Sequence, residues 1–193
     1  MGGIYLNQAA ATGWRITFSS AGTFTAASCS GSNLQSAPTP TYTPATVHTV
    51  PSNGAIYTDV DAIVSGPVNG RVTVGSGQNI VVAGNIAPVT GGDDVIGLVA
   101  YSDLGVAAYA PNVLTWNAAI LVETNTSRST GASHRAGSVM TFTGSAATAT
   151  GGSFDEYASR IYAYDPNLRF LPPPWFPSID DTYTTAFFRE VKP

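Results

Sequence analysis

Short runs of β-forming residues, each ended by glycine, asparagine or proline, fill residues 54–150 and limit the fold more than any other feature. Residues 71–74 and 79–82 are typical runs, rich in valine and isoleucine, and the break at residues 75–77 (GSG) separates them. No segment of about a dozen residues combines a helical apolar period with helix caps. We therefore predict an all-β protein.

Two all-β architectures fit this pattern, a β-solenoid and a β-sandwich. Strands of a sandwich average about five to six residues and alternate apolar with polar side chains. The runs in residues 54–150 are shorter, turn sharply, and place aliphatic residues at consecutive positions. Stacked rungs explain these features better, because each rung buries its aliphatic side chains on the rung before it. We therefore expect a right-handed β-solenoid of short rungs, with a β-sandwich as the alternative.

The regions on either side differ from this central one. Residues 1–37 contain a period-two apolar alternation at 14–18 before a Ser/Gly turn, which predicts an N-terminal strand or hairpin region, and residues 5–11 are expected to form a short helical lead-in. Residues 38–53 hold several prolines and are expected to be an extended connector. Residues 151–193 concentrate aromatic residues and proline, and we expect them to pack on the solenoid and cover exposed strand edges.

Composition limits the class of function. Charged residues make up 10% of the chain, against about 25% in an average soluble domain, and Lys192 is the single lysine. A surface of serine, threonine, asparagine and glycine fits an exported protein better than a cytosolic enzyme. No run of about 18 apolar residues occurs, so no membrane-spanning helix is predicted. The single cysteine, Cys29, is predicted to be a small buried apolar residue.

Three stretches in a fixed order resemble one bacterial domain family. They are residues 54–86, residues 96–121 and residues 160–177, of which the last, with its YAYDPNL and PPPWFP segments, is the most specific. The order is similar to that of a domain of unknown function in exported proteins with a type IV pilin-like helix, including PilX-type pilus-assembly proteins and ComZ-like large minor pilins. The similarity covers about residues 50–190.

The resemblance implies a β-solenoid displayed on a pilus or on the bacterial cell surface. It implies other pilus or surface-protein subunits as partners, and it implies no catalytic residues. Attachment to a membrane would come only through a pilin helix outside this chain. We accordingly expect residues 1–193 to be a fragment of a longer exported protein.

Residues suited to catalysis are few. The two histidines, His48 and His134, lie in loop-like contexts and are expected at the surface, and no nucleophile elbow, phosphate loop or zinc motif occurs. We predict no catalytic residues and no enzymatic activity. Trp175 and Phe176 are the candidate ligand- or partner-binding residues, because rigid aromatic side chains anchor interfaces; the alternative is that both pack on the flank of the solenoid. Asp165 is predicted to set a turn by accepting backbone N–H groups.

No metal site is predicted, and calcium is the one cofactor that the acidic residues bring into consideration. The acidic pairs are Asp59 and Asp61, Asp93 and Asp94, and Asp180 and Asp181. The calcium hypothesis is kept for the second and third pairs. Acidic pairs without further oxygen ligands in register are usually solvated turn residues.

These observations predict a non-enzymatic extracytoplasmic module of a type IV pilus-associated or cell-surface protein, acting as a scaffold, adhesive or binding domain. Two alternatives stay open: a polysaccharide-active β-solenoid enzyme and a DNA-capturing domain of a competence minor pilin. Polysaccharide and host or abiotic surfaces are further candidate partners. DNA is not favoured, because the net charge is −4 and the seven arginines would have to cluster on one face.

Overall fold

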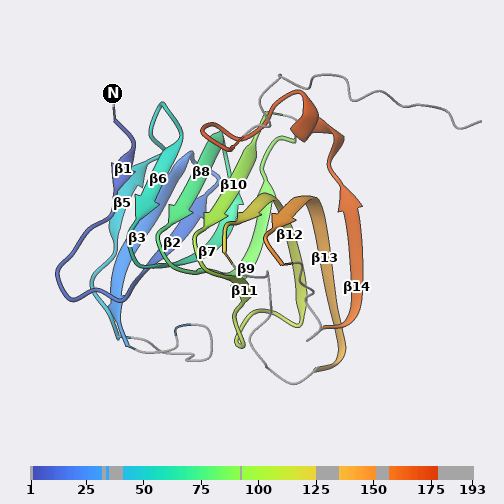
Figure 1. Ribbon diagram of the computed structural model, residues 1–193, viewed down its shortest axis with the longest axis horizontal. Coiled ribbons are helices and arrows are strands. Elements are labelled where there is room, and N and C mark those ends of the chain that lie inside the picture. The colour runs from blue at the N-terminus through green and yellow to red at the C-terminus, as the bar shows by residue number, and fades with distance from the viewer. Residues whose placement is uncertain are drawn as a thin grey trace, which may run out of the picture.

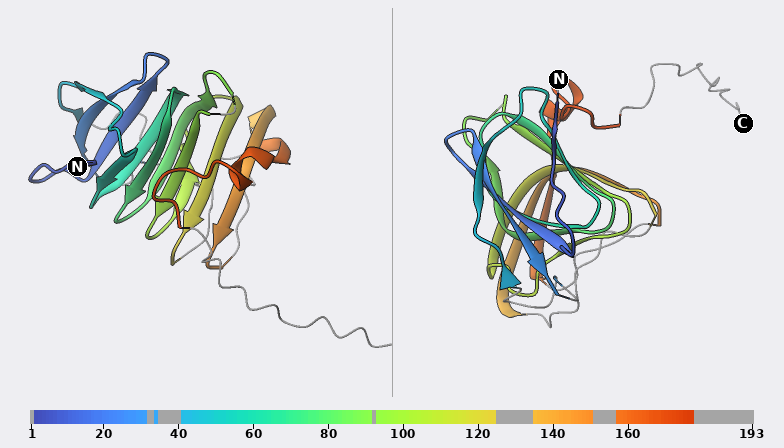
Figure 2. Two further views of the ribbon diagram at one scale, coloured as in Figure 1. Left: turned by 90° about the horizontal axis from the view of Figure 1, so that it is seen from above. Right: turned by 90° about the vertical axis from the view of Figure 1, so that its left-hand side faces the viewer.

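The computed structural model describes residues 2–31, 34, 41–91, 93–124, 135–150 and 157–177, with only the backbone of residue 135. Within these ranges fourteen strands form one strongly curled sheet (Figures 1 and 2). The strands are β1 (Ile4–Tyr5), β2 (Gly13–Ser19), β3 (Thr23–Ser30), β4 (Thr41–Tyr42), β5 (Thr46–Thr49), β6 (Ala55–Thr58), β7 (Asp61–Val68), β8 (Arg71–Ser76), β9 (Ile80–Pro88), β10 (Val95–Ala100), β11 (Leu104–Val106), β12 (Val113–Val122), β13 (Arg135–Thr148) and β14 (Tyr157–Tyr164). One 3-10 helix, η1 (Pro166–Arg169), follows them.

The all-β prediction is confirmed. Most neighbouring strands pair in parallel, and in the described residues the antiparallel pairs are those of β3 with β2, β4 and β5. A single, mostly parallel sheet is not a β-sandwich, in which two antiparallel sheets pack face to face. The sandwich alternative is therefore wrong. Across the described ranges, no helix is long and apolar enough to cross a membrane.

The N-terminal region forms the antiparallel hairpin β2–β3, in which β2 also pairs in parallel with β7. Ile16 and Phe18 are buried and Arg15 is exposed, as the period-two alternation requires. The expected helical lead-in is wrong. Ile4–Tyr5 is instead a short strand beside β6, and the Leu6 N–H continues its ladder by donating to Tyr57 O at 2.8 Å.

Strands β4 and β5 occupy part of the proline-containing stretch that was expected to be a connector. Both pair with the free edge of β3, which adds backbone hydrogen bonds where the sequence between the prolines permits them. His48 on β5 is partly buried and stacks on Phe24 with ring centroids 5.1 Å apart, so it is more enclosed than a surface loop residue.

Two columns of buried aliphatic side chains fill the inside of the curl. In the first, each residue is the Cα partner of the next on neighbouring parallel strands: Ile56, Val74, Leu98 and Ile120. In the second, the same relation joins Ile16, Val64, Val82 and Val106. All eight side chains are at most 3% exposed. Burial of these columns supplies the apolar stabilisation that aligns the parallel strands.

Several strands are longer than the short runs predicted. β12 has 10 residues and β13 has 14, because each continues around a bend in the sheet instead of ending at it. Glycine permits such a bend in β13 and in β7, where Gly144 (φ 154°) and Gly66 (φ 103°) adopt conformations that other residues rarely reach. A Cβ at Gly144 would also collide with the carbonyl of Ala118 on the neighbouring strand.

The C-terminal region has two parts. Tyr157–Tyr164 is the strand β14, which pairs with β13 and so extends the sheet instead of covering it. After η1 the chain runs back across the outside of the sheet toward β10 and β8 (Figures 1 and 2). This returning segment places Trp175 and Phe176 beside strands far from them in the sequence.

Candidate functional site

Residues 172–177, which we call the strap, are fastened to β8 through their backbone carbonyl groups. The Arg71 guanidinium donates from Nη2 to Pro172 O at 2.6 Å. The Thr73 hydroxyl donates to Pro174 O. Prolines provide no backbone N–H, so the strap can be held through its carbonyls without leaving amide donors unpaired.

Glycines on the underlying strands make room for the strap. A Cβ at Gly97 would lie 2.8 Å from Phe176 Cδ2 and 3.0 Å from Pro173 Cβ. Gly54 has the same relation to Pro174, whose ring occupies the place of a side chain. The strap therefore sits directly on backbone, and a larger residue at either glycine would displace it.

Trp175 and Phe176 are adjacent but differ in environment. Phe176 is partly buried over Gly97, whereas Trp175 is 73% exposed, so the alternative in which both rings pack on the flank is wrong for Trp175. The cause is the backbone at Trp175, whose φ of 58° turns the indole away from the surface that Phe176 contacts. The indole Nε1 donates to Asn53 O at 2.9 Å, which fixes the exposed ring.

An open groove of about 500 Å³ lies between the strap and the outer face of β6, β8 and β10. Its main lining residues are Tyr57, Gly75, Val99, Tyr101, Glu123 and Trp175. The three aromatic side chains in this set are all exposed. Tyr57 and Gly75 are Cα partners, and a Cβ at Gly75 would lie 3.0 Å from Tyr57 Cδ2. The Tyr57 ring therefore packs over Gly75, where a side chain would otherwise lie.

Acidic residues give one side of the groove a negative charge. Tyr5 stacks on Tyr57 with ring centroids 6.0 Å apart, and its hydroxyl donates to Asp59 Oδ2. This hydrogen bond, with some desolvation and the Asp59 charge, raises the pKa of Tyr5. Desolvation, followed by the charges of Asp59 and Glu123, raises the pKa of Tyr57. Both phenols therefore stay protonated, and the charges at this end of the groove are carboxylates.

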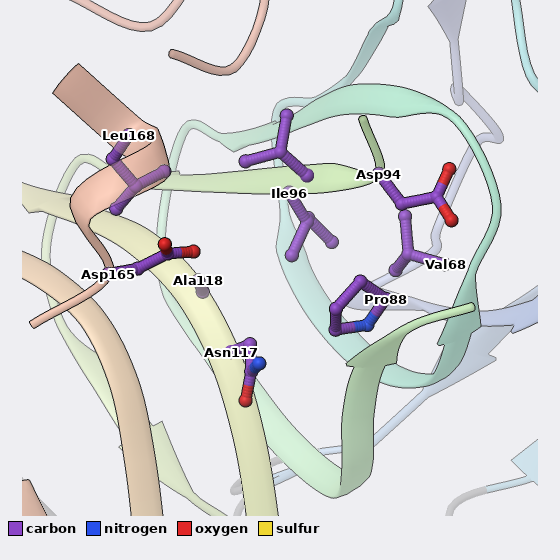
Figure 3. A pocket seen from close by; sticks show the side chains of 9 residues that line it. Val68, Pro88, Asp94, Ile96, Asn117, Ala118, Asp165 and Leu168 are labelled. Atoms are coloured by element: carbon purple, nitrogen blue, oxygen red, sulfur yellow. The ribbon is translucent and has the colours of Figure 1, made fainter. Parts of the chain in front are cut away.

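Asp165 lies outside this groove, at the N-cap of η1. Its carboxylate accepts from the Asn167 N–H at 2.9 Å, which is the turn-setting position predicted for it. It also lines a separate small cavity together with Asp94, Asn117 and Leu168 (Figure 3). Figure 3 places the two carboxylates on opposite sides of this cavity.

Asp94 is already engaged with protein donors. It accepts from Gly70 N at 2.6 Å and from both the N–H and the hydroxyl of Thr90 at 2.7 Å. Partial burial acts to raise the pKa of Asp94, but these hydrogen bonds outweigh it and the pKa is lowered. Asp94 therefore closes a turn, while its neighbour Asp93 is exposed.

The other acidic candidates do not converge on one site. Asp59 contacts Tyr5, whereas Asp61 accepts from Asn79, from N at 3.1 Å and from Nδ2 at 2.8 Å. Among the residues that the structure describes, no three histidine, cysteine, aspartate or glutamate side chains are grouped so that they could hold a metal ion. Asp180, Asp181 and His134 lie outside the described residues.

Cys29 is buried and free of a disulfide. Burial raises the pKa of its thiol to about 11, so the thiolate needed for nucleophilic or redox chemistry is not formed at neutral pH. The prediction of a small buried apolar residue is confirmed.

Sequence reasoning selected Trp175 and missed its companions in the groove. Tyr57, Tyr101 and Glu123 lie on separate runs, and only the strand register brings them together. The signal that could have found one of them is the glycine opposite Tyr57, because an exposed aromatic ring often packs over a glycine on the neighbouring strand.

No family model, curated protein or solved structure matches this chain. Its function is therefore inferred from its own fold and from the groove beside the strap.

Proposed function

We propose that the chain is a non-enzymatic, extracytoplasmic binding module of a type IV pilus-associated or other bacterial cell-surface protein. Its scaffold is a right-handed β-solenoid, and its binding surface is the groove between the strap and β6, β8 and β10. Its partners are other surface-protein subunits or the polysaccharide and host surfaces that such proteins meet. The low content of charged residues supports an exported location.

The strand register supports the solenoid. Ala55, Thr73, Gly97, Ala119 and Ser145 are successive Cα partners on parallel strands. Each lies roughly twenty residues beyond the one before, which is the repeat length of stacked coils. The buried column of Ile56, Val74, Leu98 and Ile120 has a similar spacing, because each coil contributes one residue to it. The antiparallel hairpin β2–β3 then closes one end of the stack.

The single observation that carries the binding function is the conformation of Trp175. A large aromatic residue with φ of 58° is strained, and such strain costs roughly 1–3 kcal/mol, so it persists only where the surroundings enforce it. Here the neighbouring carbonyls are held by Arg71 and Thr73, and the indole itself by Asn53. These hydrogen bonds keep the ring exposed beside a groove, which is the placement of an interface anchor.

The residues of the groove favour a non-enzymatic binding role over DNA capture and over polysaccharide cleavage. A DNA-capturing surface needs arginine or lysine aimed at phosphates, whereas Asp59 and Glu123 lie here. A polysaccharide-cleaving enzyme needs an acid/base pair placed within hydrogen-bond reach of the bond that it cleaves. Asp59 is instead the hydrogen-bond acceptor of Tyr5.

The test is retention of protein-coated beads on surfaces bearing polysaccharide, bearing protein, or left bare. Trp175→Ala should lower retention by about tenfold on at least one surface, since an anchoring aromatic is worth more than about 1.4 kcal/mol. Phe170→Ala is the matched control, because Phe170 is also a highly exposed aromatic residue but does not line the groove. Equal retention of the Trp175 and Phe170 variants would contradict the binding role, and time-dependent shortening of a polysaccharide would contradict the non-enzymatic one.

A further inference from the structure

The exposed aromatic rings of the groove lie on different strands, so they can contact successive units of one extended ligand. Tyr57 is on β6, and Val99, the Cα partner of Gly75, is two strands away on β10. Neighbouring strands are about 4.8 Å apart, so the two positions are separated by roughly 10 Å across the sheet. Tyr101 follows β10, and Trp175 overhangs the same groove from the strap.

The Tyr57 ring lies over two glycines of the groove floor. Gly75 and Gly77 have no side chains, and a Cβ at Gly77 would lie 3.0 Å from the Tyr57 hydroxyl. The groove volume of about 500 Å³ falls within the roughly 300–1,000 Å³ typical of sites for small organic ligands. The open form of the groove admits a chain that continues beyond the site at either end.

The chemistry of the lining favours a ligand that is both flat and rich in hydroxyl groups. Aromatic faces carry partial negative charge and pack against C–H groups that carry partial positive charge. Tyrosine and tryptophan also supply large contact areas at a small cost in side-chain entropy. Carboxylates such as Glu123 accept strong charge-assisted hydrogen bonds from hydroxyl groups. A pyranose ring offers both an apolar C–H face and a rim of hydroxyl donors.

The charge of the groove excludes an anionic chain. Among the described residues that line it there is no lysine or arginine, and Glu123 is one of them. Asp59 places a second negative charge near the groove, because it accepts the hydrogen bond of Tyr5, which stacks on Tyr57. Like charges across an interface are unfavourable, so uronic-acid polymers and nucleic acids would be repelled.

We propose that the groove binds a neutral polysaccharide chain, with sugar rings stacked on Trp175, Tyr101 and Tyr57 and with hydroxyl groups donating to Glu123. This inference rests on the proposed function, since it names the ligand class of the same site. The hydrogen bond from the Trp175 indole to Asn53 O keeps one stacking platform in position before the ligand arrives.

The test is titration of the whole chain with neutral hexasaccharides of glucose and mannose, followed by calorimetry and tryptophan fluorescence. Trp116 is fully buried and Trp14 partly buried, so a change in fluorescence on binding reports chiefly on the exposed Trp175. Trp175→Ala should weaken binding by at least about tenfold, and Trp175→Phe should retain most of it. Glu123→Gln should weaken it by about threefold, and the control Phe170→Ala should leave it unchanged.

Comparison ligands make the ligand class falsifiable. A galacturonate hexamer and single-stranded DNA should not bind, whereas a cationic glucosamine hexamer should bind more tightly in low salt than in high salt, because Glu123 and Asp59 attract it. Binding of only the charged hexamers would overturn the inference, as would binding that survives Trp175→Ala. Trp175→Gly repeats the test with a residue suited to a positive φ, and its circular dichroism spectrum separates a loss of binding from a failure to fold. Beads that lose retention through Trp175→Ala while no neutral sugar binds would leave the binding function standing and overturn the ligand class.

Discussion

The inward and outward faces of β6, β8 and β10 are one residue apart in sequence, yet they are built differently. Inward, Ile56, Val74 and Leu98 form an unbroken column of bulky aliphatic side chains. Outward, the partners one position later are Tyr57, Gly75 and Val99, a column in which a large ring is followed by no side chain at all. The inner column is stabilised by close packing of its side chains. The outer column leaves gaps at its glycine positions, and other groups can occupy these gaps.

Only part of that outer space is taken up by the chain itself. At Gly97 the strap fills it with Phe176 and Pro173, and at Gly75 the neighbouring tyrosine ring fills it. Farther along, the groove stays open and Trp175 remains exposed. The comparison teaches that stability and binding are separable here, since they depend on opposite faces of the same strands. Substitutions on the two faces should therefore have different effects.

The largest loss of stability is expected from a substitution in the inner column. Leu98→Ala should lower the free energy of unfolding by about 2–5 kcal/mol, because it leaves a cavity at a fully buried site. Its outward neighbour Val99 is partly exposed, so Val99→Ala should cost less than about 1 kcal/mol. Urea denaturation followed by circular dichroism measures both. Equal losses would mean that the two faces are not energetically distinct.

An intermediate loss of stability is expected from a substitution at the contact between the strap and the sheet. Gly97→Val would place side-chain atoms where Phe176 and Pro173 now lie, so the strap should detach. The expected cost is about 1–3 kcal/mol, typical of overpacking. Limited proteolysis should cut the strap in this variant while the strands stay protected. A strap that remained protected would show that the glycine is not what seats it.

Trp175→Gly should have a small effect on stability and a large one on binding. Glycine adopts the positive φ freely, so relief of roughly 1–3 kcal/mol of strain offsets the loss of the indole hydrogen bond to Asn53. The free energy of unfolding should change by less than about 1 kcal/mol, while bead retention falls. A strong destabilisation would instead make Trp175 part of the structural core of the strap.

The smallest effects concern two carboxylates with opposite pKa shifts. The pKa of Asp94 is lowered, since its hydrogen bonds outweigh desolvation, so its stabilising contribution is present above the unfolded pKa of about 3.9 and is lost as the pH falls below it. Burial raises the pKa of Asp61, so its charged form costs stability at neutral pH and protonation recovers it on acidification.

These signs predict different behaviour of two matched variants. Asp94→Asn should destabilise the protein at pH 7, and this effect should diminish as the pH falls below about 4. Asp61→Asn should be neutral or slightly stabilising at pH 7, with the gain vanishing in acid. Unfolding free energies measured between about pH 3 and pH 7 provide the comparison. Parallel pH profiles for the two variants would contradict the assignment.

The positions of individual strands were easier to predict from the sequence than the strands with which they pair. The aliphatic runs gave the strands of residues 54–100, and the alternation at Ile16 and Phe18 gave the hairpin, because both signals are contained in a few residues. The strands β4 and β5 were missed because the prolines that flank them favour a connector, while β3 offers them backbone partners. Their pairing is a tertiary effect that outweighs the local tendency.

The candidate site was harder to predict for a related reason. Trp175 stood out by its residue type, but Tyr101 and Glu123 reach the groove only through the register of β10 and β12. The number of residues between Cα partners on neighbouring strands is not constant. Counting along the sequence therefore does not show which residues share one face of the sheet. The positive φ at Trp175 has no sequence signal, since tryptophan disfavours it and the tertiary hydrogen bonds impose it.

The last strand, β14, pairs with β13 on one side, and its residues from Ala158 to Tyr164 are exposed. The strap follows β14 along the chain, with η1 between them. If tension were applied to the C-terminal side of the molecule, the strap would be pulled away first and β14 would peel next, before the load reached the buried columns. A mechanical load in that direction would therefore release whatever the groove holds while the rest of the sheet stayed intact, and a load applied at the hairpin end would not.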